Sequence, residues 1–133
     1  MLLEIKGLNF NYPGKEIFQS FDLKAPPGKI LHLNGPSGAG KTTLLHLIAG
    51  IQSPQSGAIT LGEEVFYNNK QKLLIEERRV GLVFQDYALF PHLKVINNIS
   101  FGNKDITEEK INKALHQLDI HELKNKYPEE ISG

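Results

Sequence analysis

The stretch Gly35-Pro36-Ser37-Gly38-Ala39-Gly40-Lys41-Thr42 decides the fold of this 133-residue chain. It fits the phosphate-binding pattern G-x-x-x-x-G-K-[ST] at every fixed position. Its glycines let the backbone turn tightly and aim successive N–H groups at an anion. Lys41 adds a charge that reaches the β- and γ-phosphates of a nucleotide, and the hydroxyl of Thr42 is a ligand for Mg²⁺. The stretch therefore predicts a nucleotide phosphate site.

The flanking residues place this loop between a strand and a helix. Residues 29–33, Lys-Ile-Leu-His-Leu, predict a short buried strand that enters the loop. Residues 42–49 predict a helix that leaves it, and Gly50 follows as a helix-ending residue. The positive end of that helix then points at the phosphates. A glycine-rich turn that holds no ligand is the alternative, and the strand–loop–helix pattern argues against it.

The bulk composition describes one domain of ordinary size. Hydrophobic residues make up 40% of the chain, and 15 basic residues balance 15 acidic ones. A zero net charge argues against a dedicated nucleic-acid surface, so no nucleic-acid partner is expected. The absence of cysteine excludes disulfides and thiolate metal sites, and the five histidines lack metal-ligand spacing. The longest apolar run, residues 44–51, is too short to span a bilayer, so a membrane role requires a partner.

The first half of the chain reads mainly as strands. Residues 2–10 and 16–24 predict an antiparallel pair, and residues 58–61 a further short strand. The pair Arg78-Arg79 is expected to form a solvated or lightly paired edge. Residues 80–84 predict a buried strand of the parallel type, and Gln85 follows its carboxyl end, where ligands of α/β sheets collect. From position alone, Gln85 is equally well a polar residue that starts a loop.

The second half reads as helices. Residues 93–101 have helical spacing, and Thr107 predicts the N-cap of another helix. An apolar face follows that cap, made of Ile111, Ala114, Leu115 and Leu118. Residues 121–126 predict one more short helix before Pro128.

Three further segments complete a resemblance. Residues 81–93, Gly-Leu-Val-Phe-Gln-Asp-Tyr-Ala-Leu-Phe-Pro-His-Leu, look like the Q-loop region of the ATP-binding subunits of ABC transporters. Residues 127–133, Tyr-Pro-Glu-Glu-Ile-Ser-Gly, look like the start of their signature motif. Tyr12, in Asn9-Phe10-Asn11-Tyr12-Pro13-Gly14, matches their aromatic A-loop. Spacing alone favours Tyr12 as part of a hairpin core, whereas the resemblance implies that it stacks on adenine.

The resemblance covers essentially the whole chain and implies an α/β fold. Its core is a P-loop NTPase core of the RecA-like type, with an N-terminal antiparallel β subdomain and the start of an α-helical subdomain. Residues 1–85 correspond to the nucleotide-binding part, and residues 86–133 to the Q-loop and helical part. The acidic Walker B strand, the catalytic glutamate, the D-loop and the switch histidine match no residue here. We therefore expect an incomplete domain, the N-terminal part of a longer subunit, which alone is inactive as an ATP hydrolase.

The resemblance also implies ATP and Mg²⁺ as cofactors and assigns a role to each matching residue. Lys41 and Gln85 are catalytic, and Thr42 and Gln85 meet the metal. The residues expected to bind ATP are Tyr12, Gly35, Pro36, Ser37, Gly38, Ala39, Gly40, Lys41, Thr42, Thr43, Ser132 and Gly133. Ser132 and Gly133 would face the ATP of a second subunit in a head-to-tail dimer.

A membrane permease is the other implied partner, so the protein is expected at the cytoplasmic face of the cell membrane. The permease would dock near residues 86–100. The apolar side chains of that segment are equally well core residues: Tyr87, Leu89, Phe90 and Leu93.

The imported solute is expected to be a small oxyanion such as molybdate. Residues 61–69 and 77–81 most resemble the molybdate importers, while iron(III), sulfate and polyamine importers share much of residues 89–92. A soluble ABC-type ATPase, or a nucleotide-binding module without hydrolysis, stays open as an alternative.

Overall fold

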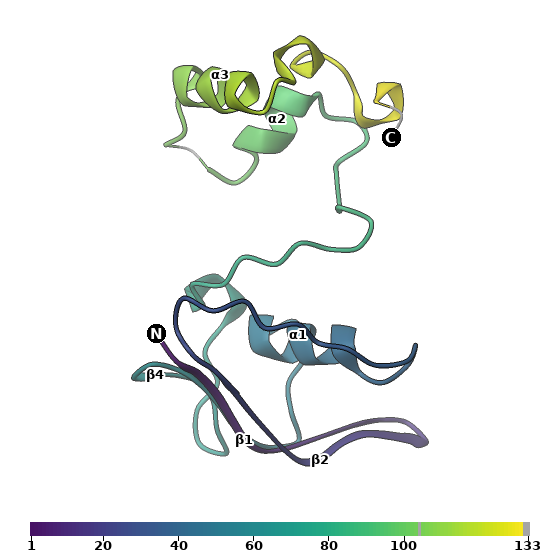
Figure 1. Ribbon diagram of the computed structural model, residues 1–133, viewed down its shortest axis with the longest axis vertical. Helices are drawn as coiled ribbons and strands as arrows, with labels where there is room; N and C mark the ends of the chain where they lie inside the picture. The colour runs from purple at the N-terminus through teal and green to yellow at the C-terminus, as the bar shows by residue number, and fades with distance from the viewer. Residues whose placement is uncertain (104, 132–133) are drawn as a thin grey trace. The chain divides into compact units, whose positions relative to one another are not determined.

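The computed structural model describes residues 1–103 and 105–131 of the chain. It separates into two compact units, Met1–Leu82 and Val83–Gly133 (Figure 1). The expected boundary between residues 85 and 86 stays a prediction, and each unit is described by itself below.

The first unit is built on one antiparallel sheet with the strand order β2-β1-β3-β4. Its strands are β1 (Leu3–Tyr12), β2 (Lys15–Ala25), β3 (Ser56–Leu61) and β4 (Glu64–Tyr67). Tyr12 pairs with Lys15 across the hairpin turn, and Leu3 pairs with Leu61 of β3. The predicted antiparallel pair and the predicted strand over residues 58–61 are therefore confirmed.

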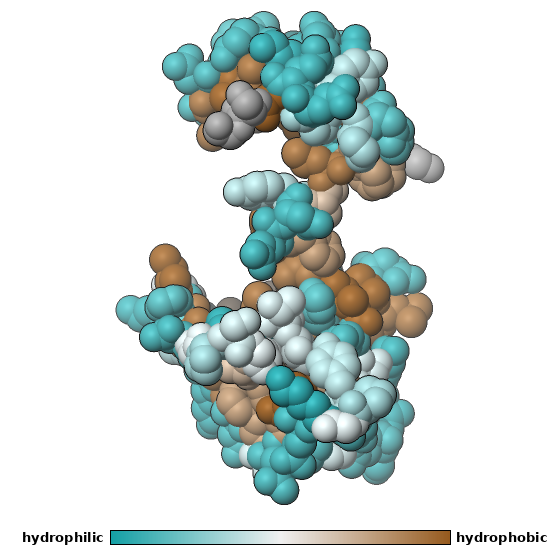
Figure 2. All heavy atoms as spheres, turned by 90° about the vertical axis from the view of Figure 1, so that its right-hand side faces the viewer, coloured by the Kyte–Doolittle hydropathy of each residue, from teal (hydrophilic) through white to brown (hydrophobic). Residues whose placement is uncertain are grey.

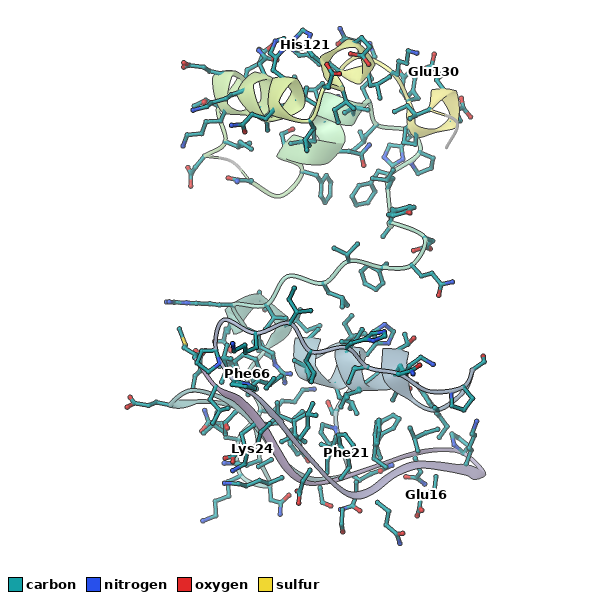
Figure 3. The ribbon with its side chains drawn as sticks, viewed as in Figure 1. Glu16, Phe21, Lys24, Phe66, His121 and Glu130 are labelled. Carbon is teal, nitrogen blue, oxygen red and sulfur yellow. The ribbon has the colours of Figure 1, made fainter. Side chains whose placement is uncertain are left out.

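The core of the first unit lies between this sheet and helix α1 (Lys41–Ala49) (Figure 1). Leu44 and Leu47 of α1 are buried in the same cluster as Phe66 of β4, which is fully buried (Figure 3). Within β1, a register shift follows Ile5, and Gly7 there adopts a φ of 55°. A bulge adds one residue to the strand, so Ile5 and Leu8 both face the core instead of opposite sides of the sheet.

A buried arginine joins the C-terminal end of α1 to β4. The side chain of Arg78 is 5% exposed, and its Nη1 donates hydrogen bonds of 2.8 Å to the carbonyl oxygens of Leu47 and Ile48. Nη2 donates to Phe66 O at 3.0 Å, and Nε donates to Leu73 O at 3.3 Å. Burial lowers the pKa of this guanidinium. The expectation that Arg78 lies at a solvated edge is wrong, while Arg79 is exposed.

Gly50 makes room for this arginine. It ends α1 with a φ of 90°, and its N–H donates to His46 O at 2.9 Å. A Cβ at Gly50 would lie 2.8 Å from Cζ of Arg78, so glycine is required here both by the backbone and by the close approach of the guanidinium.

Two predicted strands do not form. In residues 29–33, Ile30 is fully exposed and Leu31 is 46% exposed; in residues 80–84, Val83 is 82% exposed. Neither segment is a strand in the described part of the chain. An apolar segment of the parallel type is stable as a strand only when neighbours pair with its backbone and cover both faces. The four-stranded sheet described here supplies neither segment with such a neighbour.

The second unit is helical, with α2 (Val95–Ser100) and α3 (Glu108–Gln117) as its α-helices. The predicted N-cap is confirmed, because Thr107 Oγ1 accepts a hydrogen bond from the Lys110 N–H. The described residues also form three short 3-10 helices, the first of them in the first unit: Ile75–Glu77, His121–Leu123 and Pro128–Glu130. The second is shorter than the helix predicted over residues 121–126.

Only half of the apolar face predicted for α3 is buried. Ile111 and Leu115 are 3% and 1% exposed, whereas Leu118 is 69% exposed and Ala114 is also exposed. Leu118 is the C-cap residue of α3, where the helix ends.

Replacing Arg78 with Met is expected to lower the free energy of unfolding by about 2–4 kcal/mol. The change removes charge-assisted hydrogen bonds and leaves buried carbonyl oxygens without a donor. Urea denaturation of the full-length protein measures the change. The matched control is Arg79→Met, at an exposed neighbour, with an expected change within about 0.5 kcal/mol. Equal effects of the two substitutions would contradict the structural role of Arg78.

Candidate functional site

The loop before α1 takes the conformation that its glycines allow. Gly38 and Gly40 have φ angles of 78° and 91°, and Gly40 is the N-cap of α1. A Cβ on Gly40 would lie 2.5 Å from Cγ2 of Ile17 and 3.0 Å from Cζ of Phe18. The loop is thus held against β2 at a distance that only glycine permits.

Lys41 folds its side chain back over the loop. Its Nζ donates hydrogen bonds of 2.8 Å to the carbonyl oxygens of both Gly35 and Pro36. The ammonium therefore lies beside the loop backbone and at the N-terminus of α1, where the first N–H groups have no partner within the helix. An ammonium and a row of N–H groups at a positive helix end are suited to a polyphosphate.

The two threonines that follow differ in burial. Thr42 is exposed, so its hydroxyl is free of the core and suited to a hard cation such as Mg²⁺. Thr43 is 8% exposed and faces Tyr12: its Oγ1 lies 3.4 Å from the Tyr12 hydroxyl.

Tyr12 at the end of β1 is fixed by several contacts and is 37% exposed. Besides Thr43, its hydroxyl accepts a hydrogen bond of 2.8 Å from Nε2 of Gln52. Its ring lies edge-on to Phe10, with 5.0 Å between the centroids. Hydrogen bonds with Thr43 and then Gln52 lower the pKa of the phenol. Gln52 was missed in the sequence, since no local pattern marks a contact across 40 residues.

The structure brings the expected phosphate-loop residues and Tyr12 together in the first unit. Gln85 belongs to the second unit, where it is exposed in a turn over residues 85–88. Tyr87 and Ala88 of that turn have φ angles of 60° and 46°, which are uncommon for residues other than glycine. Ser132 and Gly133 lie outside the described residues.

The segment proposed to meet a permease exposes apolar side chains. Tyr87 is 74%, Leu89 52% and Phe90 37% exposed, and Figure 2 shows apolar surface along this part of the chain. Asn98 of α2 fixes the segment, because it accepts from Phe90 N–H at 2.9 Å and donates to Leu93 O at 2.9 Å.

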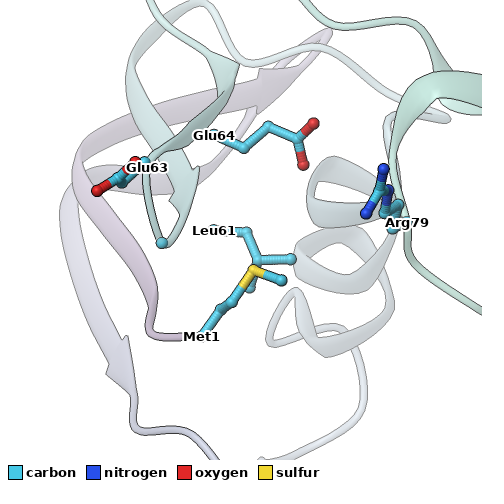
Figure 4. A pocket seen from close by; sticks show the side chains of 6 residues that line it. Met1, Leu61, Glu63, Glu64 and Arg79 are labelled. Atoms are coloured by element: carbon cyan, nitrogen blue, oxygen red, sulfur yellow. The ribbon is translucent and has the colours of Figure 1, made fainter.

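A separate hollow lies at the sheet edge of the first unit, away from the phosphate loop in sequence (Figure 4). Its lining is Met1, Leu61, Gly62, Glu63, Glu64 and Arg79. The described residues contain no group of three or more His, Cys, Asp or Glu side chains that is arranged to hold a metal ion. None of their helices has both the length and the apolar character needed to span a membrane.

A glycine-rich loop that ends in lysine at a helix N-terminus is the arrangement of P-loop proteins. The family model described as ABC transporter matches residues 18–133. The chain therefore belongs to the ABC transporter family as an ATP-binding domain, and members of this family bind ATP with Mg²⁺ and hydrolyse it to drive transport.

The chain is similar to ATP-binding proteins of importers. The chain is 35% identical to the sulfate/thiosulfate import ATP-binding protein CysA of Pseudomonas syringae, over 100% of this chain and 43% of the relative. It is 41% identical to the spermidine/putrescine import ATP-binding protein PotA of Fusobacterium nucleatum, over 98% of this chain and 35% of the relative. The chain thus spans about two fifths of the length of these relatives.

Replacing Gly40 with Ala is expected to lower the free energy of unfolding by about 2–4 kcal/mol and to weaken ATP binding. Alanine is strained at the positive φ of this position, and its methyl group would collide with Ile17. Gly14→Ala is the control, since Gly14 has a φ of 75° but nothing within 4 Å of its Cβ position. Chemical denaturation compares the two, and a Gly40→Ala loss no larger than the control's would show that the close approach to β2 is unimportant.

Proposed function

We propose that this chain forms the nucleotide-binding part of an ATPase subunit that powers import of a small solute through a membrane permease. The observation that supports this most is the placement of Lys41 Nζ, which is 2.8 Å from two carbonyl oxygens of the loop at the N-terminus of α1. In this proposal the ammonium exchanges those carbonyls for the β- and γ-phosphates of ATP.

In this proposal, different residues of the first unit bind different parts of the nucleotide. The loop over residues 35–40 and the N–H groups of the first turn of α1, including that of Thr43, bind the phosphates, and Tyr12 stacks on adenine. Thr42 holds Mg²⁺, which neutralises the phosphate charge when bound. Phosphoryl transfer needs mainly positioning and neutralised charge, and these residues supply both.

The remaining residues are proposed to connect the nucleotide site to the helical unit, to a second subunit and to the permease. Gln85 meets the Mg²⁺ and couples the nucleotide to the helical unit. Ser132 and Gly133 face the ATP of a second subunit in a head-to-tail dimer. The permease docks on the segment over residues 86–100, so the protein would lie at the cytoplasmic face of the membrane. Residues 1–85 and 86–133 correspond to the nucleotide-binding and helical parts of the domain.

The solute has three candidates. Residues 61–69 and 77–81 most resemble those of molybdate importers, whereas the relatives named above are a sulfate/thiosulfate and a spermidine/putrescine import ATP-binding protein. The permease and its binding protein select the solute, since no residue of this chain is proposed to contact it. Uptake of molybdate, sulfate and spermidine, each measured in vesicles with the cognate permease, distinguishes the candidates.

Replacing Lys41 with Ala in the full-length protein is expected to lower ATP affinity by about 10- to 100-fold, because a charge-assisted contact to phosphate is lost. Isothermal titration calorimetry measures the affinity, and circular dichroism checks the fold. The control is Lys113→Ala, at an exposed lysine of α3. Unchanged affinity in a folded Lys41→Ala protein would refute the proposed phosphate site.

Replacing Gln85 with Ala is expected to leave ATP affinity unchanged and to lower hydrolysis that is coupled to transport. The reason is that Gln85 is proposed to report the nucleotide to the helical unit instead of binding it tightly. Gln117→Ala, at an exposed glutamine of α3, is the control. A loss of nucleotide binding equal to that of Lys41→Ala would contradict the coupling role.

A further inference from the structure

The backbone of Gln52 is held in position by the C-terminal end of α1. The helix ends at Gly50, and the N–H groups of Gly50 and Gln52 both donate to His46 O, at 2.9 Å and 3.3 Å. This pair of hydrogen bonds turns the chain back at the helix end. The backbone of Gln52 is therefore part of the same rigid piece as the helix that carries the phosphate loop.

The side chain of Gln52 reaches the far end of the Tyr12 ring. Its Nε2 lies 2.8 Å and its Oε1 3.2 Å from the Tyr12 hydroxyl, which also lies 3.4 Å from Oγ1 of Thr43. Thr43 belongs to the first turn of α1 and is buried. The Tyr12 hydroxyl is thus held between the first turn of α1 and Gln52, two residues beyond the C-cap Gly50.

The loop over residues 52–55 also holds the backbone beside Tyr12. The Asn11 N–H donates to Oε1 of Gln55 at 2.9 Å, and Nε2 of Gln55 donates to Asn11 O at 3.2 Å. Gln55 therefore fixes the end of β1, and Gln52 fixes the ring that projects from it. With Phe10 edge-on to the ring, the plane of the phenol is set before any ligand arrives.

We infer that Gln52 is a positioning residue for base recognition: it holds Tyr12 against α1 so that the base site and the phosphate site form one preorganised unit. The inference rests on the proposed stacking of Tyr12 on adenine. A ring that is already oriented loses less rotational freedom when a base stacks on it, so ATP binds more tightly. Gln52 contacts neither the phosphates nor the base in this scheme and acts only through Tyr12.

The test compares MgATP with magnesium tripolyphosphate, which carries the phosphates and lacks the base. Gln52→Leu and Tyr12→Phe, made in the full-length protein, are each expected to weaken ATP binding by about 3- to 10-fold, the effect of one hydrogen bond. Affinity for tripolyphosphate stays unchanged in both. The double variant is expected to be no weaker than the weaker single variant, because both changes break the same contact.

Further variants separate the possible failures. Gln71→Leu, at an exposed glutamine of the same unit, is the control and keeps both affinities. Equal losses for ATP and tripolyphosphate in Gln52→Leu would overturn the inference, since Gln52 would then support the helix generally. Normal ATP affinity in Gln52→Leu and Tyr12→Phe beside a loss in Tyr12→Ala would overturn it while preserving the stacking role. Normal ATP affinity in Tyr12→Ala would refute the proposal that Tyr12 stacks on adenine.

Discussion

The hydrogen bonds from Arg78 to the end of α1 are the constraint on which the first unit depends. A helix leaves its last carbonyl oxygens without partners, and here a buried guanidinium satisfies those of Leu47 and Ile48. A cation at the negative end of the helix also complements its dipole. The same guanidinium lies 5.2 Å from the centre of the Phe66 ring and donates to Phe66 O, so α1 cannot shift along the sheet without breaking these contacts.

The other end of α1 is held by close approach instead of by charge. Gly40 lies so near Ile17 and Phe18 of β2 that no side chain fits between them. One end of the helix is therefore fixed to β4 and the other to β2, at opposite edges of the sheet. Both anchors act on a helix of nine residues, which is too short to be stable in water by itself. The position of the phosphate loop follows from these tertiary contacts, and the helix propensity of the sequence contributes little.

The parts that the sequence predicted well are those with a local signal. The loop over residues 35–42, the helix after it and the Thr107 cap each follow from residues that are adjacent in the chain. The prediction of a solvated edge for Arg78 was wrong for two reasons. Its partners are backbone carbonyl oxygens, which every residue has and no sequence pattern marks, and two adjacent arginines usually indicate a surface. The segments over residues 29–33 and 80–84 have the composition of buried strands, but a strand forms only with a neighbour, and pairing is not a local property.

The residues proposed to bind the nucleotide and the residue proposed to couple binding to transport differ in how the structure fixes them. The groups proposed to bind the nucleotide lie at or beside α1, and contacts within the first unit fix them. Lys41 is held by the loop carbonyl oxygens, Thr43 by its place in the first turn, and Tyr12 by the hydrogen bonds of its hydroxyl. Gln85 directly follows an apolar segment, residues 80–84, that no strand of the described sheet stabilises. Its position must then depend on contacts that α1 does not provide. Contacts within the first unit thus hold the groups proposed to bind the nucleotide, whereas Gln85, which is proposed to couple binding to transport, belongs to the second unit. Separate placement of these two sets of groups suits the proposal that nucleotide binding changes the position of another part of the protein.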